Sequence, residues 1–213
     1  MHQNAAAVLF TLAVPTATLA DCPTATPSVY LAEDDDAAGT GNVFQAFDRP
    51  NRSASGVIAF AGDTNGPTTS DDVVYVGSTL VAREGEIVPG APGAVFDFFE
   101  FFETARQVNA NGEVAYIATL RSDPLGRDRG VFLGSSAVAI EGDAAPTKDG
   151  RVYTDFGFVS VTDDGRVAFL AEMDGSSSGN AAIIFDGEVV YQKGGAVPGH
   201  PDETWDGTFD EVQ

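Results

Sequence analysis

One short pattern recurs three times along this chain and constrains its fold more than any other feature. In each copy a glycine is followed, three and four residues later, by an alanine and an aromatic residue. The copies are Gly56-Val-Ile-Ala-Phe60, Gly112-Glu-Val-Ala-Tyr116 and Gly165-Arg-Val-Ala-Phe169. Recurrence at a near-constant interval is typical of folds that stack one structural unit on the next. The chain is therefore predicted to be a tandem array of similar units.

Three further landmarks follow each copy in the same order, at intervals of a little over 50 residues. An aromatic residue stands two positions before a glycine, a proline stands four positions after a glycine, and an aromatic pair closes the unit. These landmarks are Tyr75 with Gly77, Phe132 with Gly134, and Phe185 with Gly187; Gly85 with Pro89, Gly142 with Pro146, and Gly194 with Pro198; and Phe96 with Phe99, Tyr153 with Phe156, and Trp205 with Phe209. Phe44 and Phe47 supply a further aromatic pair upstream. The predicted units span about 43–94, 95–151 and 152–204, with partial units at both ends of one repeat domain, 29–213.

Each unit is predicted to hold four short antiparallel strands. Asn111-Gly112 and Asp164-Gly165 are strong signals for a two-residue hairpin turn with positive φ at both positions, and Ser55-Gly56 is a weaker one. The predicted strands around these turns, taken in order along each unit, are 105–109 and 156–161; 113–120 and 166–172; 72–76, 130–133 and 182–185; and 79–83, 137–140 and 188–192. A lone strand is predicted at 29–33, followed by an acidic turn at 34–42. No stretch has a sustained helical period.

These features predict an all-β fold of β-propeller-like tandem repeats, because four short antiparallel strands in about 50 residues are typical of a propeller blade. In that fold the motif alanine lets adjacent sheets approach, and Phe60, Tyr116 and Phe169 fill the space between them. An open β-solenoid is the alternative, since it also stacks repeats. A closed propeller usually has about 4–8 blades. Three complete units therefore indicate an incomplete propeller, and we expect the sequence to be a piece of a longer array. Closure with another copy and an open array with exposed edges are the alternatives.

The charge of the chain is strongly acidic. It has 11 Lys and Arg against 32 Asp and Glu, a formal net charge of −21. Such a field repels phosphate backbones, so nucleic acid is excluded as an expected partner, and anionic membranes are disfavoured. Solubility is the simplest explanation of the acidity. Life at high salt and divalent-cation binding are the alternatives.

The N-terminus resembles a targeting segment. Residues 5–20 are small and apolar, and Thr18-Leu19-Ala20 before Asp21 is a fair signal-peptidase site. We therefore expect a signal peptide at 1–20 and a linker at 21–28, with the protein secreted or at the cell surface. The apolar run is short for a transmembrane span. Cys22, the single cysteine, excludes an internal disulfide, and Asp21 beside it disfavours a lipoprotein.

The repeats resemble a bacterial family of secreted tandem-repeat proteins named for the motif N-x-x-G-x-x-A-F and described as choice-of-anchor proteins. Asn109 to Tyr116 matches the motif with Tyr for Phe, Thr162 to Phe169 with Thr for Asn, and Ser53 to Phe60 with Ser for Asn. The linker from Glu84 to Gly90 fits the family pattern E-G-(D/E)-x-x-P-G, and Glu141 to Pro146 fits without the last glycine. The resemblance covers about 29–213. It implies a secreted, surface-displayed repeat protein and no known activity.

Residues that could carry chemistry are few. Only His2 and His200 are histidines, so a zinc site of His/Cys type is excluded and a Ser-His-Asp triad has no support. The acidic groups 34–36, 71–72 and 163–164 match no calcium-loop motif, so Ca²⁺ is conceivable without being indicated. The aromatic run 96–102 is predicted to be a core strand with its packing, with a sugar-stacking surface as the alternative. We assign no catalytic, cofactor-binding or metal-binding residue.

Two classes of function remain. The first is a non-catalytic extracellular or cell-surface repeat protein, a binding or adhesion scaffold whose unknown ligand, carbohydrate or protein, contacts the loops after the second strands. The second is a propeller-type polysaccharide hydrolase or lyase with carboxylates at the channel mouth. Asp63, Asp123 and Asp174 would then have to converge. The first class is favoured because repeat folds do not fix an activity.

Overall fold

The computed structural model describes residues 30–99 and 106–205. Within these residues the chain folds entirely into β-strands and connecting turns, so the all-β prediction is confirmed. In the same part of the chain no helix is long and apolar enough to cross a membrane. The described residues from Leu31 onward belong to one compact unit. The predicted signal peptide, the linker, Cys22, His2 and Phe209 lie outside the described residues.

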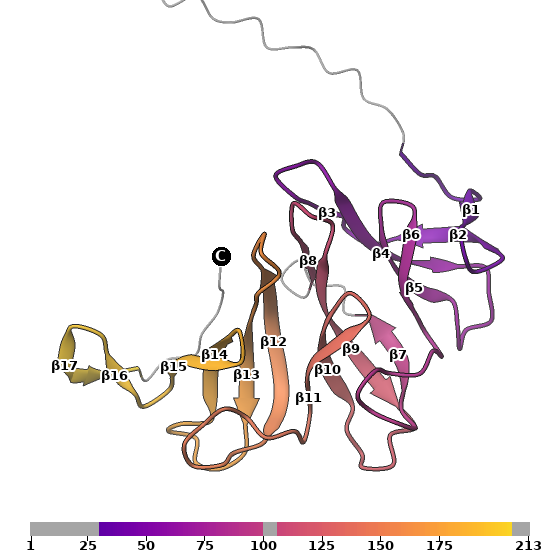
Figure 1. Ribbon diagram of the computed structural model, residues 1–213. Helices are drawn as coiled ribbons and strands as arrows, with labels where there is room; N and C mark the ends of the chain where they lie inside the picture. Colours follow the sequence, from indigo (N-terminus) through magenta and orange to yellow (C-terminus); the bar gives the residue numbers. More distant parts are fainter. Residues whose placement is uncertain (1–29, 100–105, 206–213) are drawn as a thin grey trace, which may run out of the picture. The chain divides into compact units, whose positions relative to one another are not determined.

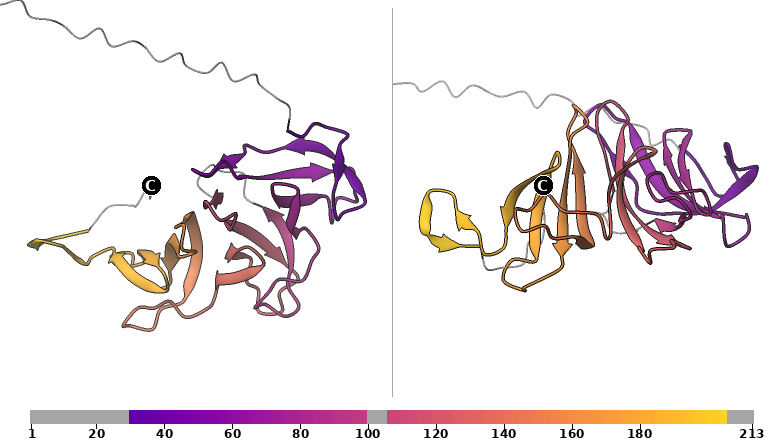
Figure 2. Two further views of the ribbon diagram at one scale, coloured as in Figure 1. Left: turned by 45° about the horizontal axis from the view of Figure 1, so that its top comes forward. Right: turned by 60° about the horizontal axis from the view of Figure 1, so that its bottom comes forward.

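Three larger antiparallel sheets follow one another along the chain, and a small hairpin comes after them (Figure 1, Figure 2). The first sheet has the order β1-β2-β4-β5-β6, with β3 beside β4: β1 (Asp36–Ala37), β2 (Asn42–Phe47), β3 (Asn51–Arg52), β4 (Ile58–Thr64), β5 (Asp72–Val76) and β6 (Thr79–Arg83). The second has the order β11-β10-β9-β7, with β8 beside β9: β7 (Val95–Phe99), β8 (Arg106–Val108), β9 (Val114–Arg121), β10 (Arg129–Leu133) and β11 (Ser136–Ile140). The third has the order β12-β13-β14-β15: β12 (Tyr153–Val161), β13 (Val167–Met173), β14 (Ala181–Phe185) and β15 (Glu188–Gln192). The hairpin consists of β16 (Ala196–Val197) and β17 (His200–Thr204).

Most predicted strands lie within two residues of their observed positions, and three coincide with β5, β6 and β15. The first strand of the third unit is longer than predicted, since β12 begins at Tyr153 and not at Phe156. In the second unit the core strand predicted within 96–102 is β7, and β7 and β8 both pair with β9. The prediction of a strand at 29–33 is wrong for the described residues from Tyr30 onward. The first strand is instead β1, inside the segment predicted to be a turn. Positive φ at Gly39 and Gly41 returns the chain so that Ala37 pairs with Asn42.

Each sheet has two chemically different faces, because successive side chains of a strand point to opposite sides. We call one the aromatic face: it carries the motif aromatic and the aromatic pair. The pairs are close in all three sheets, with ring centroids 4.9 Å apart for Phe44 and Phe47 and 5.3 Å apart for Phe96 and Phe99 and for Tyr153 and Phe156. We call the other the small-residue face: it carries Ala59, Ala61, Val74 and Ala82 in the first sheet, Ala115, Ile117, Val131 and Ala139 in the second, and Ala168, Leu170, Ile183 and Tyr191 in the third.

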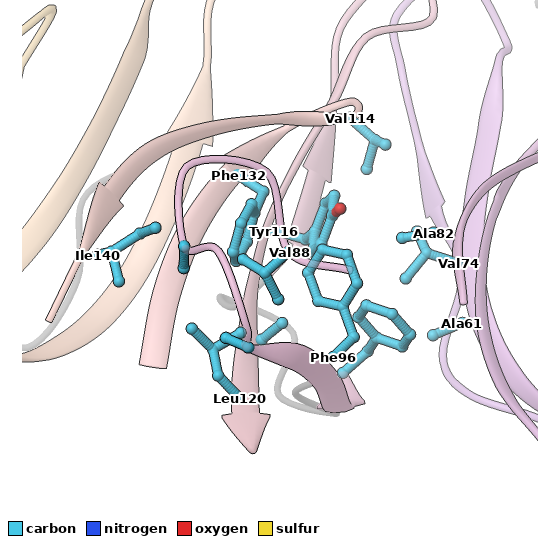
Figure 3. Close-up of a cluster of buried hydrophobic side chains, with 14 of the residues drawn as sticks. Ala61, Val74, Ala82, Val88, Phe96, Val114, Tyr116, Leu120, Phe132 and Ile140 are labelled. Carbon is cyan, nitrogen blue, oxygen red and sulfur yellow. The ribbon is translucent and has the colours of Figure 1, made fainter. Parts of the chain in front are cut away.

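Sheets meet by placing a small-residue face against the next aromatic face. At the first junction Ala61, Val74 and Ala82 pack into one buried cluster with Phe96 and Tyr116 of the second sheet (Figure 3). At the second junction the small-residue face of the second sheet joins a cluster built on the aromatic face of the third. The motif alanine and the motif aromatic therefore serve two different junctions.

Candidate functional site

The three copies of the glycine motif form the same turn. Asn109 N–H donates to Glu113 O over 3.0 Å, and Gly112 N–H donates to Asn109 O over 3.2 Å. The same two bonds occur at 53–57 and 162–166, and the motif glycines have φ of 81° to 90°. This is a three-residue loop, a type I turn followed by a left-handed glycine. The predicted two-residue turn with two positive φ values is wrong, because Asn111 and Asp164 do not have positive φ.

The first residue of the motif explains the longer loop. The side-chain oxygen of Asn109 accepts hydrogen bonds from the backbone N–H groups of Asn111 (3.0 Å) and Glu113 (2.9 Å). Ser53 Oγ accepts from Val57 N–H in the first copy, and Thr162 Oγ1 from Arg166 N–H in the third, both over 3.0 Å. Asn, Ser and Thr thus play the same role: the side-chain oxygen of each accepts the backbone N–H four residues later and so closes the turn.

Replacing Asn109 by alanine is expected to destabilise the protein by about 1–3 kcal/mol, because the turn loses a buried acceptor, Asn109 being 3% exposed. The side chain also donates to Thr162 O across the second junction over 3.0 Å. Urea denaturation followed by circular dichroism measures the loss. Asn109→Ser, which keeps an oxygen as Ser53 does, should recover part of it. Equal losses in the two variants would show that the side-chain oxygen does not hold the turn.

The motif turns of neighbouring sheets are bonded to one another, and we call 53–57, 109–113 and 162–166 the motif-turn row. Ser55 Oγ donates to Ala110 O over 2.8 Å across the first junction. Asn111 Nδ2 donates to Asp163 O over 2.6 Å across the second. Ala110 N–H also donates to Asp163 Oδ1 over 2.9 Å. Several polar groups of the motif-turn row therefore form hydrogen bonds between neighbouring sheets.

Charged side chains are buried where the first and second sheets meet. Asp72 on β5 is 4% exposed, and its Oδ2 accepts the backbone N–H of Phe99 over 2.9 Å. Arg106 on β8 is 2% exposed, donates to Arg49 O over 3.2 Å, and interacts electrostatically with Asp48 and Asp72. Buried charges are retained only when they are paired. This buried charge cluster therefore ties the first two sheets together.

A second set of charges lies at the same junction. Arg121 on β9 forms ion pairs with Glu84 over 2.8 Å and with Asp97 over 2.9 Å, and it donates to Thr69 O over 2.9 Å. Glu84 is 5% exposed, and its pKa is raised by burial, an effect that the hydrogen bond from Arg121 opposes. Arg121 thus joins β9 to Glu84 and to the loop that contains Thr69, and also pairs with Asp97 of β7 in its own sheet.

Burial raises the pKa of Asp72 to about 7; the hydrogen bond from Phe99 lowers it, whereas Asp63, Asp48 and Glu84 raise it. Because this pKa lies above the value of about 3.9 in an unfolded chain, the folded state binds the proton more tightly between these pH values. The stabilisation from protonated Asp72 is complete below about pH 4 and is lost as the pH rises through 7.

The free energy of unfolding is therefore expected to be larger at pH 5.5 than at pH 8, by on the order of 1–3 kcal/mol from Asp72. Asp72→Asn keeps an acceptor for the Phe99 amide and cannot ionise, so it should flatten the dependence. Urea midpoints at the two pH values test this. A residual slope is expected from Asp48, Asp63, Glu84 and Glu141, whose pKa values burial also raises. An unchanged slope in the variant would rule out Asp72 as the source.

Comparison with known proteins places the chain in a family. Residues 25–137 match a protein family described as a family of unknown function (DUF7453). The match covers more than half of the chain. The chain belongs to this family. No curated protein and no solved structure shows a significant match to it.

The family match contains the first two motif copies and every residue of the buried charge cluster. Asp48, Asp72 and Arg106 all lie between 25 and 137, as do Glu84 and Arg121. The third sheet lies beyond the matched range. The family match thus spans the first junction except for Ile140 at the end of β11.

The acidic residues singled out in the sequence have structural partners. Asp123 accepts the N–H of Leu125 over 2.6 Å and pairs with Arg127 over 2.8 Å. Asp174 Oδ1 accepts the N–H of Val152 over 3.0 Å. Asp63 lies opposite Asp72 in the sheet, and its pKa is raised by burial and by Asp71. The three carboxylates considered for hydrolysis thus sit in three different local environments.

The remaining candidates do not form a site either. Asp35 accepts the N–H of Ala32 over 2.8 Å, and Asp164 pairs with Arg166 over 2.9 Å. The side chain of His200 is 63% exposed and 3.5 Å from Glu203. Among the described residues, no group of three or more His, Cys, Asp or Glu side chains could hold a metal ion.

An open depression of about 490 Å³ lies beside the third sheet. It is lined by Pro146, Thr147, Lys148, Asp149, Gly187, Glu188, Val189 and Gln192. Lys148 is one of only two lysines in the chain, the other being Lys193. Sequence patterns gave no sign of this depression, because its two walls come from segments about 40 residues apart.

Proposed function

We propose that the chain is a non-catalytic binding scaffold of propeller-like tandem repeats. The protein is exported and is either secreted or held at the cell surface. Three antiparallel sheets with equivalent junctions support a propeller-like arrangement, and three sheets are fewer than the usual 4–8 blades of a closed one. The array would accordingly be an incomplete propeller. The apolar leader of the sequence supports export.

The observation that carries the proposal is that three loops of unrelated sequence are each held by arginine. These loops, 65–71, 122–128 and 174–180, join the second strand of each sheet to the third. Arg83 Nε donates to Ser70 O over 2.7 Å in the first loop. Arg127 pairs with Asp123 in the second, and Arg151 donates to Asp174 O over 2.9 Å in the third. Variable loops on a fixed framework are a common way to build a binding surface.

The position of these loops supports the same function. In an antiparallel meander, the turn before the second strand and the loop after it lie at opposite ends of the sheet. The motif-turn row occupies one end, and its turns are hydrogen-bonded to one another between neighbouring sheets. The loops occupy the other end, where Thr68, Leu125 and Ser177 are exposed. We place the ligand-binding surface at this loop end, with a carbohydrate or a protein as the ligand.

A polysaccharide hydrolase would need an accessible acid of raised pKa. Asp72 has a raised pKa, but its exposure of 4% keeps it from a substrate. Asp63 is partly exposed and its pKa is also raised, so among the three candidates it alone has this property. Asp123 and Asp174 are engaged by Arg127 and by a backbone amide. These contacts favour the scaffold over the enzyme, and we propose no catalytic residue.

The proposal can be tested with the full chain on arrays of polysaccharides and extracellular proteins. Thr68→Glu, Leu125→Glu and Ser177→Glu, combined at the loop tips, should abolish binding to any captured ligand. Ser78→Glu with Ser135→Glu adds exposed charges at the opposite end and should leave binding intact. Equal loss in both variants would contradict a loop-end surface. Release of new reducing ends from a polysaccharide would contradict the non-catalytic assignment.

A further inference from the structure

The open depression beside the third sheet lies at a place that is covered in the second sheet. One wall is the segment that leads from β11 to β12, and the other is β15 with the turn before it. In the preceding unit the counterpart is the segment from β6 to β7, where Val88 N–H donates to Ala94 O over 3.0 Å. In the later segment Ala145 N–H donates to Arg151 O over 2.8 Å. The two bonds enclose equal numbers of residues, so the segments can be compared position by position.

In the second sheet the segment from β6 to β7 packs directly on the outer strand, β11. Ala91 and Ala94 are 0% exposed and belong to one buried cluster with Ile140 of β11. A Cβ atom added at Gly90 would lie 3.3 Å from the Cβ of Ala137 and 3.6 Å from Cδ1 of Ile140. Small apolar residues thus allow this segment to close over the strand.

In the third sheet polar residues replace these small apolar ones. The replacements are Thr147 for Gly90, Lys148 for Ala91, Asp149 for Pro92 and Arg151 for Ala94. On the strand side, Gln192 of β15 takes the place of Ile140 of β11. Between these polar residues a depression of about 490 Å³ stays open. The opening is therefore a chemical difference between two units that share one backbone pattern.

Two charged side chains of the depression are available to a ligand. Lys148 belongs to one wall and Glu188 to the other, and both are exposed. Within 30–99 and 106–205, neither side chain forms an ion pair or a hydrogen bond. In contrast, Arg121, Arg127 and Arg151 are all paired with carboxylates. The depression thus offers a free ammonium group and a free carboxylate.

Both walls are tied to the third of the three variable loops. Gln192 Nε2 donates to Gly179 O in that loop over 3.0 Å. Arg151 donates to Asp174 O in the same loop over 2.9 Å and to Asp149 Oδ2 over 2.6 Å. The depression therefore adjoins the loop end of the third sheet, and its polar walls are held in place by hydrogen bonds.

We propose that this depression binds a neutral saccharide, with Lys148 donating to its hydroxyl groups and Glu188 accepting from them. The inference rests on the proposed binding function and assigns that function a ligand class and a site. A hydroxyl group both donates and accepts, so it suits walls that offer both kinds of partner. Pro146 and Val189 add apolar surface for the C–H groups of a sugar ring. The volume lies within the range of about 300–1,000 Å³ found for small-ligand sites.

The charges favour a neutral ligand over other classes. The net charge of −21 repels an anionic ligand from the chain as a whole. Lys148 repels a cationic ligand at the site itself. A purely apolar ligand would take Lys148 and Glu188 out of water without giving either a partner, which is costly. A neutral polyhydroxylated ligand avoids all three penalties.

Titration calorimetry of the full chain with cellotetraose, xylotetraose, mannotetraose and maltotetraose tests the proposal. At least one of these neutral tetrasaccharides should bind. Lys148→Ala and Glu188→Ala should each weaken that binding about tenfold or more, because each removes a hydrogen bond to a charged group. Lys193→Ala removes the other lysine, which does not line the depression, and should leave binding unchanged. Circular dichroism confirms that each variant is folded.

The outcomes separate this inference from the proposed function. Failure of all four neutral tetrasaccharides to bind would overturn the inference, as would tighter binding of a galacturonate or a glucosamine tetramer. Binding that survives both Lys148→Ala and Glu188→Ala but is lost in the loop-tip variant would also overturn it, while the loop-end function stands. If the full chain captures no polysaccharide and no protein on the arrays, the proposed function itself fails.

Discussion

Replacing Arg106 by methionine is expected to lower the free energy of unfolding by about 3–5 kcal/mol at pH 8. The guanidinium group is 2% exposed and lies in the field of Asp48 and Asp72, which lose their compensating charge in the variant. Methionine keeps much of the side-chain length, so packing changes little. The loss therefore arises from uncompensated carboxylates between the first two sheets. Urea denaturation at pH 8 measures it.

The effect of Arg106→Met should depend on pH and on Asp72. At pH 5.5 Asp72 is largely protonated, since its pKa is about 7, so the loss should be smaller than at pH 8. Adding Asp72→Asn to Arg106→Met should restore part of the stability at pH 8. A loss that is the same at both pH values and in both backgrounds would show that Arg106 contributes through packing and not through charge.

Replacing Phe169 by alanine is expected to cost about 3–5 kcal/mol. Phe169 is 1% exposed in the second core cluster, with its ring centroid 5.8 Å from that of Phe156 in an edge-to-face contact. Truncation leaves a cavity between β13 and the second sheet. Thermal or urea unfolding measures the loss. Leu125→Ala, at a side chain that is 75% exposed, is the control and should change stability by less than about 0.5 kcal/mol. A small effect for Phe169 would contradict its role as a junction residue.

Much of the fold could be predicted because its signals are local. β5, β6 and β15 coincide with their predicted ranges, since each is a short apolar run bounded by glycine or aspartate turns. The Asp186-Gly187 pair between β14 and β15 has positive φ at both positions, 52° and 77°, as such a pair favours. Local sequence and local structure agree wherever no side chain competes with the backbone.

The motif turn was mispredicted because such a side chain is present. Asn111-Gly112 has the sequence of a two-residue turn, but Asn109 Oδ1 binds the N–H groups of Asn111 and Glu113 and fixes a three-residue loop. The variation among Asn, Ser and Thr at this position was visible in the sequence. All three are small residues with a side-chain oxygen acceptor, and that shared property was the available signal.

The buried charge cluster could not be predicted because its members are distant in sequence. Asp72 reaches the Phe99 amide 27 residues later, and Arg106 reaches Arg49 O 57 residues earlier. No motif links these residues, and in an acidic chain each looks like an ordinary surface charge. Only the packing of β5 against the second sheet reveals them.

The central claim is that the motif alanine makes each junction by its small size. Ala59 and Ala115 are 0% exposed between sheets, whereas Ala168 lies on the partly exposed face of the third. The decisive measurement is the free energy of unfolding of Ala59→Leu, Ala115→Leu and Ala168→Leu. We predict losses of about 1–3 kcal/mol for the first two and less than about 0.5 kcal/mol for the third. Equal losses at all three positions, or no loss at Ala59 and Ala115, would contradict the claim.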